Sequence, residues 1–226
     1  MKMEDYALFI KETLDRYKGK YKHEPLKNLP VYNDQTVICG YLRPITEDYR
    51  ITLPGCSALL GKWREENPGI ATGTFQVTRE RTEKWLDEHI IGRDDRILFL
   101  IVALDGQFLG HIGFSSFDYQ EKACEVDAVL RGVKDIQPGL MGYALNSLIC
   151  WGHNDLQLEK ITLKVFADNT HAIQFYQRCG FQVVQLIPLV KVALPSEEKW
   201  EIRSQLQGIV AERYYTEMIY KGMGVL

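Results

Sequence analysis

The spacing of apolar residues along the chain alternates between the period of a helix and that of a strand. Residues 4–18 place apolar side chains every three or four positions, as an amphipathic helix does. The same spacing predicts further helices over residues 57–66, 79–91, 140–156 and 169–178, and a shorter one near 47–53. Thr78 is a suitable N-cap for the helix over 79–91.

Short apolar or alternating runs between these helices predict β-strands at residues 36–46, 96–104, 107–114, 124–132, 160–166, 181–189 and 212–221. Asp105-Gly106 separates two of these runs, which is the strongest short-range signal for a hairpin. The two-residue period of a strand over the run 124–132 places Glu125, Asp127 and Val129 on one face. Residues 19–30 read as a connector, and residues 194–208 as a solvated helix or loop.

The order of the predicted elements indicates the fold class. Three consecutive strands form an antiparallel meander, and the later strand–helix–strand unit must cross over in the right-handed sense to a parallel neighbour. We therefore expect a mixed α/β fold, with a mostly antiparallel sheet flanked by helices. The expected organisation is an N-terminal helical arm at 1–35 and one domain at 36–226, with its core at 36–190 and a C-terminal extension at 191–226.

Composition and charge exclude several classes of function. The 226 residues are 46% hydrophobic and 25% charged, which is typical of a globular protein with a core. The net charge is −3 and no basic block is interleaved with aromatics, so we expect no nucleic-acid partner. The most apolar stretch, 97–104, is far shorter than the roughly 20 residues that span a bilayer.

The cysteines and the N-terminus point to a cytoplasmic protein. Five scattered cysteines without a C-x-x-C motif predict thiols in a reducing compartment and no zinc site, so we expect no bound metal. The first 22 residues carry charges every few positions and lack the apolar region of a secretory signal.

The stretch "DIQPGLMGYALNSLICW" contains two glycines, Gly139 and Gly142, just before a predicted helix. The first turn of a helix offers unpaired amides and a positive dipole end, which suit a pyrophosphate group. The alternative is that the pair serves only as a turn at the helix start. No Lys-Ser/Thr follows the glycines and no G-x-G-x-x-G is present, so nucleotide hydrolysis and nicotinamide chemistry lose support.

The segment from residue 138 to 181 resembles the core of the GNAT superfamily of N-acetyltransferases. The matching motifs are "GLMGYA", "LEKI", an Asn at 169 that opens a short helix, and "AIQFY" followed by "GF". The resemblance extends over residues 36–187. Gly139 stands where the superfamily usually has Arg or Gln, and Met141 where it has a basic residue, so the grip on phosphate relies on backbone amides.

The resemblance implies acetyl transfer from acetyl-CoA to a primary amine. It implies that the cofactor is held by Val129, Leu130, Gly139, Leu140, Met141, Gly142, Tyr143, Ala144 and Asn169. Tyr176 occupies the place of a general acid that protonates the CoA thiolate. The alternatives are that Tyr176 is a core residue of its helix and that Asn169 is only a helix cap.

The base that takes the proton of the amine is sought on the strand 124–132. Glu125 and Asp127 share a face there, and two acids beside a cofactor can raise one another's pKa and attract a cationic amine. The alternative is an ordinary solvated strand face. His111, on the neighbouring strand, is an outside candidate for the base and is also placed among the substrate-binding residues; its alternative is a structural histidine.

Residues 63–67 and 78–85 resemble the part of the superfamily that acetylates amino groups of nucleotide-linked sugars. The residues concerned are Trp63, Arg64 and Trp85, although both indoles also suit a core. We therefore expect a small-molecule amine as partner, with an amino sugar first. A polyamine, a protein N-terminus or a non-catalytic acyl-CoA-binding module are the alternatives, and the sequence leaves a homodimer open.

Overall fold

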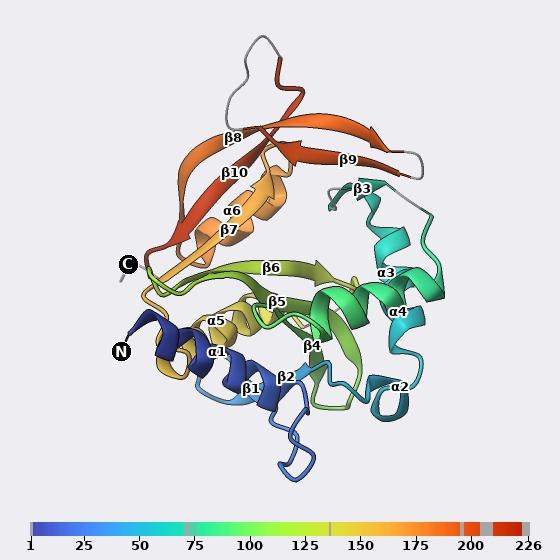
Figure 1. Cartoon of the computed structure of the whole chain (residues 1–226), viewed down its shortest axis with the longest axis vertical. Coiled ribbons are helices and arrows are strands. Elements are labelled where there is room, and N and C mark those ends of the chain that lie inside the picture. Colours follow the sequence, from blue (N-terminus) through green and yellow to red (C-terminus); the bar gives the residue numbers. More distant parts are fainter. Residues whose placement is uncertain are drawn as a thin grey trace. The chain divides into compact units, whose positions relative to one another are not determined.

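A computed structural model describes residues 2–70, 73–74, 76–135, 137–194, 197–203 and 210–222 (Figure 1). The chain divides into two compact units. The first unit comprises Met1–Cys56 and Glu83–Ile161, and the second comprises Ser57–Thr82 and Thr162–Leu226.

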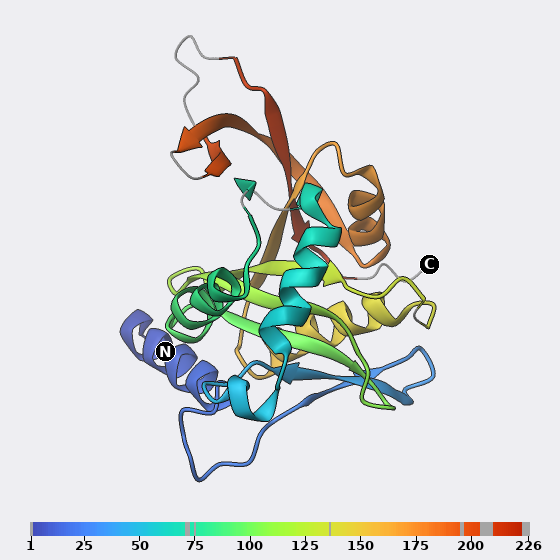
Figure 2. The same cartoon turned by 90° about the vertical axis from the view of Figure 1, so that its right-hand side faces the viewer.

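The first unit contains an antiparallel sheet in the strand order β1-β2-β4-β5-β6, seen from two sides in Figure 1 and Figure 2. β4 is its most buried strand, since only its last residue is partly exposed. The strands are β1 (Leu29–Tyr32), β2 (Ile38–Pro44), β4 (Ile97–Ala103), β5 (Phe108–Asp118) and β6 (Ala123–Arg131). The helices are α1 (Met3–Tyr17), α2 (Tyr49–Thr52), the π-helical η2 (Leu86–Ile91) and α5 (Leu140–Asn154).

Trp151 on α5 lies at the centre of the core of the first unit. Its ring centroid lies 4.9 Å from that of Tyr17, 5.4 Å from that of Phe99 and 6.0 Å from that of Phe114. These rings come from α1, β4 and β5, so one indole joins both helices to the sheet. The Tyr6 hydroxyl also donates a hydrogen bond to the Leu156 carbonyl at 2.8 Å. This packing fixes α5, whose first turn follows the glycine loop.

The second unit contains strands in the order β7-β10-β8-β9-β3. β7 and β8 both run antiparallel to β10, which lies between them, so β7 and β8 are parallel to one another. The strands are β3 (Gly73–Thr74), β7 (Lys160–Phe166), β8 (Phe181–Leu194), β9 (Glu197–Ile202) and β10 (Arg213–Tyr220). The helices are α3 (Cys56–Glu66), η1 (Pro68–Ile70) and α6 (Thr170–Arg178). The helix α4 (Arg79–Trp85) begins in this unit, and its last three residues, which include Trp85, belong to the first unit.

The mixed α/β fold is confirmed, and β7 has the predicted bounds. Three local predictions were wrong. β1 begins inside the expected connector, the helix predicted over 79–91 changes to π geometry at Leu86, and residues 197–202 form β9. β9 was missed because its sequence "EEKWEI" is mostly charged. Its pairing with β8 overrides that weak strand propensity.

The expected boundary between an arm at 1–35 and a domain stays a prediction, while α1 itself lies in the first unit with α5 and β4. Among the described residues, no helix is long and apolar enough to cross a bilayer. All five cysteines are described, and none of them forms a disulfide.

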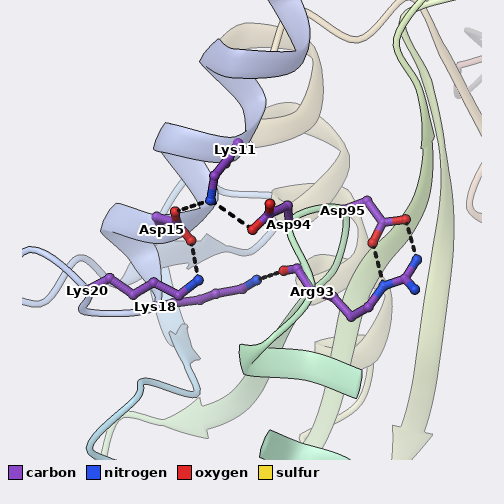
Figure 3. Close-up of polar contacts among 7 residues, drawn as sticks. All are labelled: Lys11, Asp15, Lys18, Lys20, Arg93, Asp94 and Asp95. Carbon is purple, nitrogen blue, oxygen red and sulfur yellow. Dashed lines mark hydrogen bonds and ion pairs between the residues drawn. The ribbon is translucent and has the colours of Figure 1, made fainter. Parts of the chain in front are cut away.

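An ion pair and a hydrogen bond connect α1 and the residue after it to residues 93–94 (Figure 3). The Lys11 amine contacts Asp15 at 3.0 Å and Asp94 at 2.9 Å, and Lys20 pairs with Asp15 at 2.6 Å. These contacts raise the pKa of Lys11, chiefly through its hydrogen bond to Asp94. The network therefore holds α1 against the loop that leads into β4.

Lys18 is the buried member of this cluster. Its side chain is 0% exposed, and its amine donates a hydrogen bond to the Arg93 carbonyl (Figure 3). Burial lowers the pKa of Lys18 to about 8, although Asp15, Asp94 and Asp95 act in the opposite direction. Burial of a charged amine opposes folding near neutral pH, because desolvation disfavours the charged form.

Lys18→Met tests this with a pH dependence of known sign. The pKa of Lys18 is about 8 in the folded chain and roughly 10.4 in the unfolded chain. Between these two pH values the unfolded chain binds a proton that the folded chain has lost. The contribution of Lys18 to stability therefore rises with pH over this range. From pH 7 to 10.5 the wild type should gain about 2–3 kcal/mol in unfolding free energy relative to Lys18→Met, measured by urea denaturation.

Lys11→Met is the matched control. The folded pKa of Lys11 lies above its unfolded value, so its contribution is fully present below about pH 10 and is lost only at higher pH. The difference between wild type and Lys11→Met should therefore stay flat from pH 7 to 10. A flat difference for Lys18→Met as well would contradict the effect of burial on Lys18.

Candidate active site

β6 is interrupted by a β-bulge at Ala128. His111 on β5 pairs with Leu130, whereas Gly113 pairs with Asp127, so β6 takes three steps where β5 takes two. Ala128 has a φ of 50°, in the left-handed region that non-glycine residues seldom adopt. The predicted alternation is therefore wrong beyond Asp127. Because of the extra residue, Leu130 lies on the same face of β6 as Asp127, and Val129 does not.

Side chains hold both polar groups of Ala128. Its amide donates to Asp127 Oδ1 at 2.7 Å, and its carbonyl accepts from His111 Nδ1 at 2.5 Å. Nδ1 must carry the proton, because a carbonyl oxygen can only accept. Burial lowers the pKa of His111 to about 4, so the imidazole is neutral near pH 7.

Asp127 also forms an ion pair with Arg96, through the carboxylate oxygen that Ala128 does not use. The Arg96 guanidinium lies 5.8 Å from the ring centroid of Trp85, which is half-buried. The structure thus brings three predicted residues, Asp127, His111 and Trp85, around one bulge. Both oxygens of Asp127 are occupied, which weakens its case as general base, and the role of Glu125 stays a prediction.

Gly139 is the N-cap of α5 and adopts a φ of 84°. A Cβ at this position would lie 2.9 Å from Cε2 of the Tyr143 ring, so the backbone conformation and the space both favour glycine. The first intrahelical bond runs from the Tyr143 amide to the Gly139 carbonyl at 2.9 Å. The amides of Met141 and Gly142 precede it, in the turn where a helix offers no carbonyl partner.

These features fit an anionic pyrophosphate. Met141 and Gly142 are half-buried and Gly139 is exposed, so the start of α5 is open to a ligand. Among the predicted cofactor residues, Leu130, Leu140 and Ala144 are 5%, 1% and 0% exposed, so their side chains belong to the core. The Tyr143 hydroxyl donates to Asp34 Oδ2 at 2.8 Å, a partner that the sequence did not indicate.

Asn169 and Tyr176 lie in the second unit. The Asn169 side chain accepts a hydrogen bond from the Ala172 amide at 3.1 Å, which confirms the predicted cap of α6. Tyr176 is 8% exposed, and its ring centroid lies 5.9 Å from that of Phe181. Tyr176 therefore packs in a core, and its role as general acid stays a prediction.

The turn before α6 is firmly held. Arg213 donates two hydrogen bonds to the Asp168 carboxylate, both at 2.9 Å, and its guanidinium lies 3.4 Å from the ring centroid of Phe166. The Ala167 amide donates to the Tyr214 carbonyl at 2.9 Å. Sequence reasoning missed Arg213, since a lone arginine at the start of a strand carries no local signal.

The residues expected to bind the acceptor differ in their surroundings. Trp63 is 2% exposed, so its indole packs in the core, and we do not propose substrate contact for it. The half-buried Arg64 donates to the Gly73 carbonyl at 2.6 Å, and burial lowers the pKa of its guanidinium. Within the described parts of the chain, no cluster of His, Cys, Asp and Glu residues suits a metal ion.

The sequence profile of the family described as "Acetyltransferase (GNAT) domain" matches residues 41–182. The chain therefore belongs to this family. It is a GNAT-type N-acetyltransferase, an enzyme class whose members use acetyl-CoA as co-substrate. No curated protein matches the sequence.

Several solved structures share the fold. A probable GNAT-family acetyltransferase from Chromobacterium violaceum has a TM-score of 0.61 at 14% identity, with 87% of each chain covered. A mutant of spermidine N-acetyltransferase SpeG from Vibrio cholerae has a TM-score of 0.57 at 14% identity, covering 79% of this chain and 93% of that one. SpeG from the same organism in complex with manganese ions has a TM-score of 0.56 at 13% identity, covering 80% and 91%.

Gly139→Ala tests whether the glycine loop is shaped for a ligand. Alanine at this φ costs roughly 1 kcal/mol of stability, and its methyl group must also displace Tyr143. We expect a loss of stability above that strain and a severalfold weaker affinity for acetyl-CoA, measured by urea denaturation and calorimetric titration.

Gly55→Ala is the control. Gly55 has the same φ of 84°, but nothing lies within 4 Å of an added Cβ. This variant should show the backbone cost alone and leave acetyl-CoA affinity unchanged. Equal effects of the two substitutions on stability and on affinity would contradict a role of the Gly139 loop in binding.

Proposed function

We propose that this enzyme transfers the acetyl group of acetyl-CoA to the primary amine of a small molecule. The observation that carries the proposal is the succession of the bulged strand β6, the left-handed Gly139 and the first turn of α5 within the first unit. The bulge interrupts a ladder, and the helix start presents amides and a positive dipole end. This succession lies inside the segment that matches the family.

Each part of the chain has a separate task in this proposal. The amides of Met141 and Gly142 bind the pyrophosphate, and the backbone at Val129 and Leu130 binds the pantetheine arm. Acetyl-CoA supplies an acetyl group activated as a thioester. Tyr176 holds the proton that the departing thiolate needs, a role taken from the family resemblance. Glu125 is the residue proposed to take the proton of the amine.

A polyamine is the acceptor that we place first. It is supported by the similarity of fold to spermidine N-acetyltransferase SpeG. The amino-sugar hypothesis loses two of its residues, because Trp63 is in the core and Arg64 donates to the Gly73 carbonyl. Trp85 beside Arg96 still favours a sugar that carries an anionic group, so an amino sugar is the second acceptor.

Acetyl-CoA binding and CoA release test the proposal together. At one hundred times its Kd, acetyl-CoA should stabilise the protein by roughly 2.7 kcal/mol, seen as a rise in Tm. Free thiol should then appear with spermidine and more slowly, or not at all, with a nucleotide-linked amino sugar or a peptide with a free N-terminus.

The outcomes separate the alternatives. A Tm rise without CoA release from any amine would support the non-catalytic acyl-CoA-binding module. Release with the amino sugar alone would reverse the order of the two acceptors. The absence of both a Tm rise and CoA release would contradict the proposed function as a whole.

A further inference from the structure

Ala128 adopts a backbone conformation that its own side chain disfavours. At a φ of 50°, the Cβ of an L-residue crowds the adjacent carbonyl, and such residues persist only where their surroundings hold them. The bulge also removes one residue of β6 from regular pairing with β5, so its polar groups need other partners. Something outside the ladder must therefore supply them.

Two side chains supply these partners, one from β6 itself and one from β5. Asp127 accepts from the Ala128 amide, and His111, across the ladder on β5, donates to the Ala128 carbonyl. The peptide groups on both sides of the Ala128 Cα are thus fixed, one by each side chain. The left-handed turn of β6 consequently has a defined orientation.

Asp127 is in turn oriented by Arg96. The two side chains are 28% and 24% exposed and form an ion pair, with the Arg96 guanidinium above the Trp85 ring. A charge-assisted contact of this kind fixes the carboxylate rotamer more firmly than a solvated acid would be fixed. A chain of contacts therefore runs from Trp85 through Arg96 and Asp127 to the Ala128 amide.

We propose that His111 and Asp127 are positioning residues, which hold the Ala128 peptide so that the backbone at Val129 and Leu130 faces the pantetheine arm of acetyl-CoA. This inference rests on the proposed function. It gives both residues a task other than the base and substrate-binding tasks predicted from the sequence. The hydrogen bond of His111 supports it, because a carbonyl oxygen only accepts and Nδ1 therefore carries the proton that holds the Ala128 carbonyl.

Substitutions at His111 separate positioning from base catalysis. The side-chain amide nitrogen of Asn can occupy the position of the His111 Nδ1 atom. The side-chain amide nitrogen of Gln lies closer to the position of Nε2. His111→Leu should weaken acetyl-CoA binding about tenfold, the loss of one well-placed hydrogen bond. His111→Asn should recover most of that affinity and His111→Gln should not. If His111 is instead a base acting through Nε2, all three variants lower kcat alike and leave the Kd unchanged, which overturns the proposal.

Ala128→Gly tests whether the strained peptide is the group being held. Glycine enters the left-handed region without a Cβ penalty, so it needs the anchors less. In the His111→Leu background, Ala128→Gly should restore acetyl-CoA affinity by about threefold, or close to half of a tenfold loss in free energy. The absence of any recovery would contradict the proposal.

Amide hydrogen exchange in the protein without acetyl-CoA distinguishes this inference from the proposed function. His111→Leu should speed exchange at Ala128 and Val129 by about tenfold or more, and His111→Asn should restore protection. Unchanged exchange in His111→Leu overturns the positioning role, whatever the enzyme binds. Faster exchange in a protein that binds no acetyl-CoA would overturn the proposed function and with it the task of the held peptide.

Discussion

The first unit depends on a conformation that one peptide of β6 would not adopt alone. Ala128 is left-handed, and hydrogen bonds from His111 and to Asp127 satisfy the groups that the bulge leaves out of the ladder. The adjacent residues of β5 are suited to this conformation of Ala128. A Cβ on Gly110 would lie 2.2 Å from the Leu130 carbonyl oxygen, so β5 approaches β6 closely just past the bulge. The irregular part of β6 therefore has hydrogen-bond partners for both backbone polar groups of Ala128.

The second constraint acts through α5. Tyr17, Phe99 and Phe114 surround Trp151 near the end of the helix, while Gly139 determines how it begins. Because the aromatic core fixes the helix, its first-turn amides keep a fixed direction relative to β6 in the same unit. A pyrophosphate bound there would need no basic side chain at Met141, since the amides and the helix dipole provide the attraction.

The sequence predicted those parts of the fold that local pattern determines. β7 and the cap of α6 were confirmed, because a clear strand period and an Asn at the N-cap act over a few residues. The left-handed conformation of Ala128 could not be predicted, since the bulge depends on the pairing of β6 with β5. Arg96 and Arg213 were missed for a similar reason, because their partners are distant in the chain. The sequence left Trp63 as either a substrate-binding residue or a core residue, and its burial places it in the core.

Backbone amide chemical shifts during a titration with acetyl-CoA report directly whether the bulge of β6 and the first turn of α5 bind the cofactor. We expect the largest changes at Val129, Leu130, Met141 and Gly142. Acetyl-pantetheine, which lacks the pyrophosphate, should shift the two residues of β6 and leave those of α5 unchanged. Changes by acetyl-CoA that avoid both the bulge of β6 and the first turn of α5 would contradict the account.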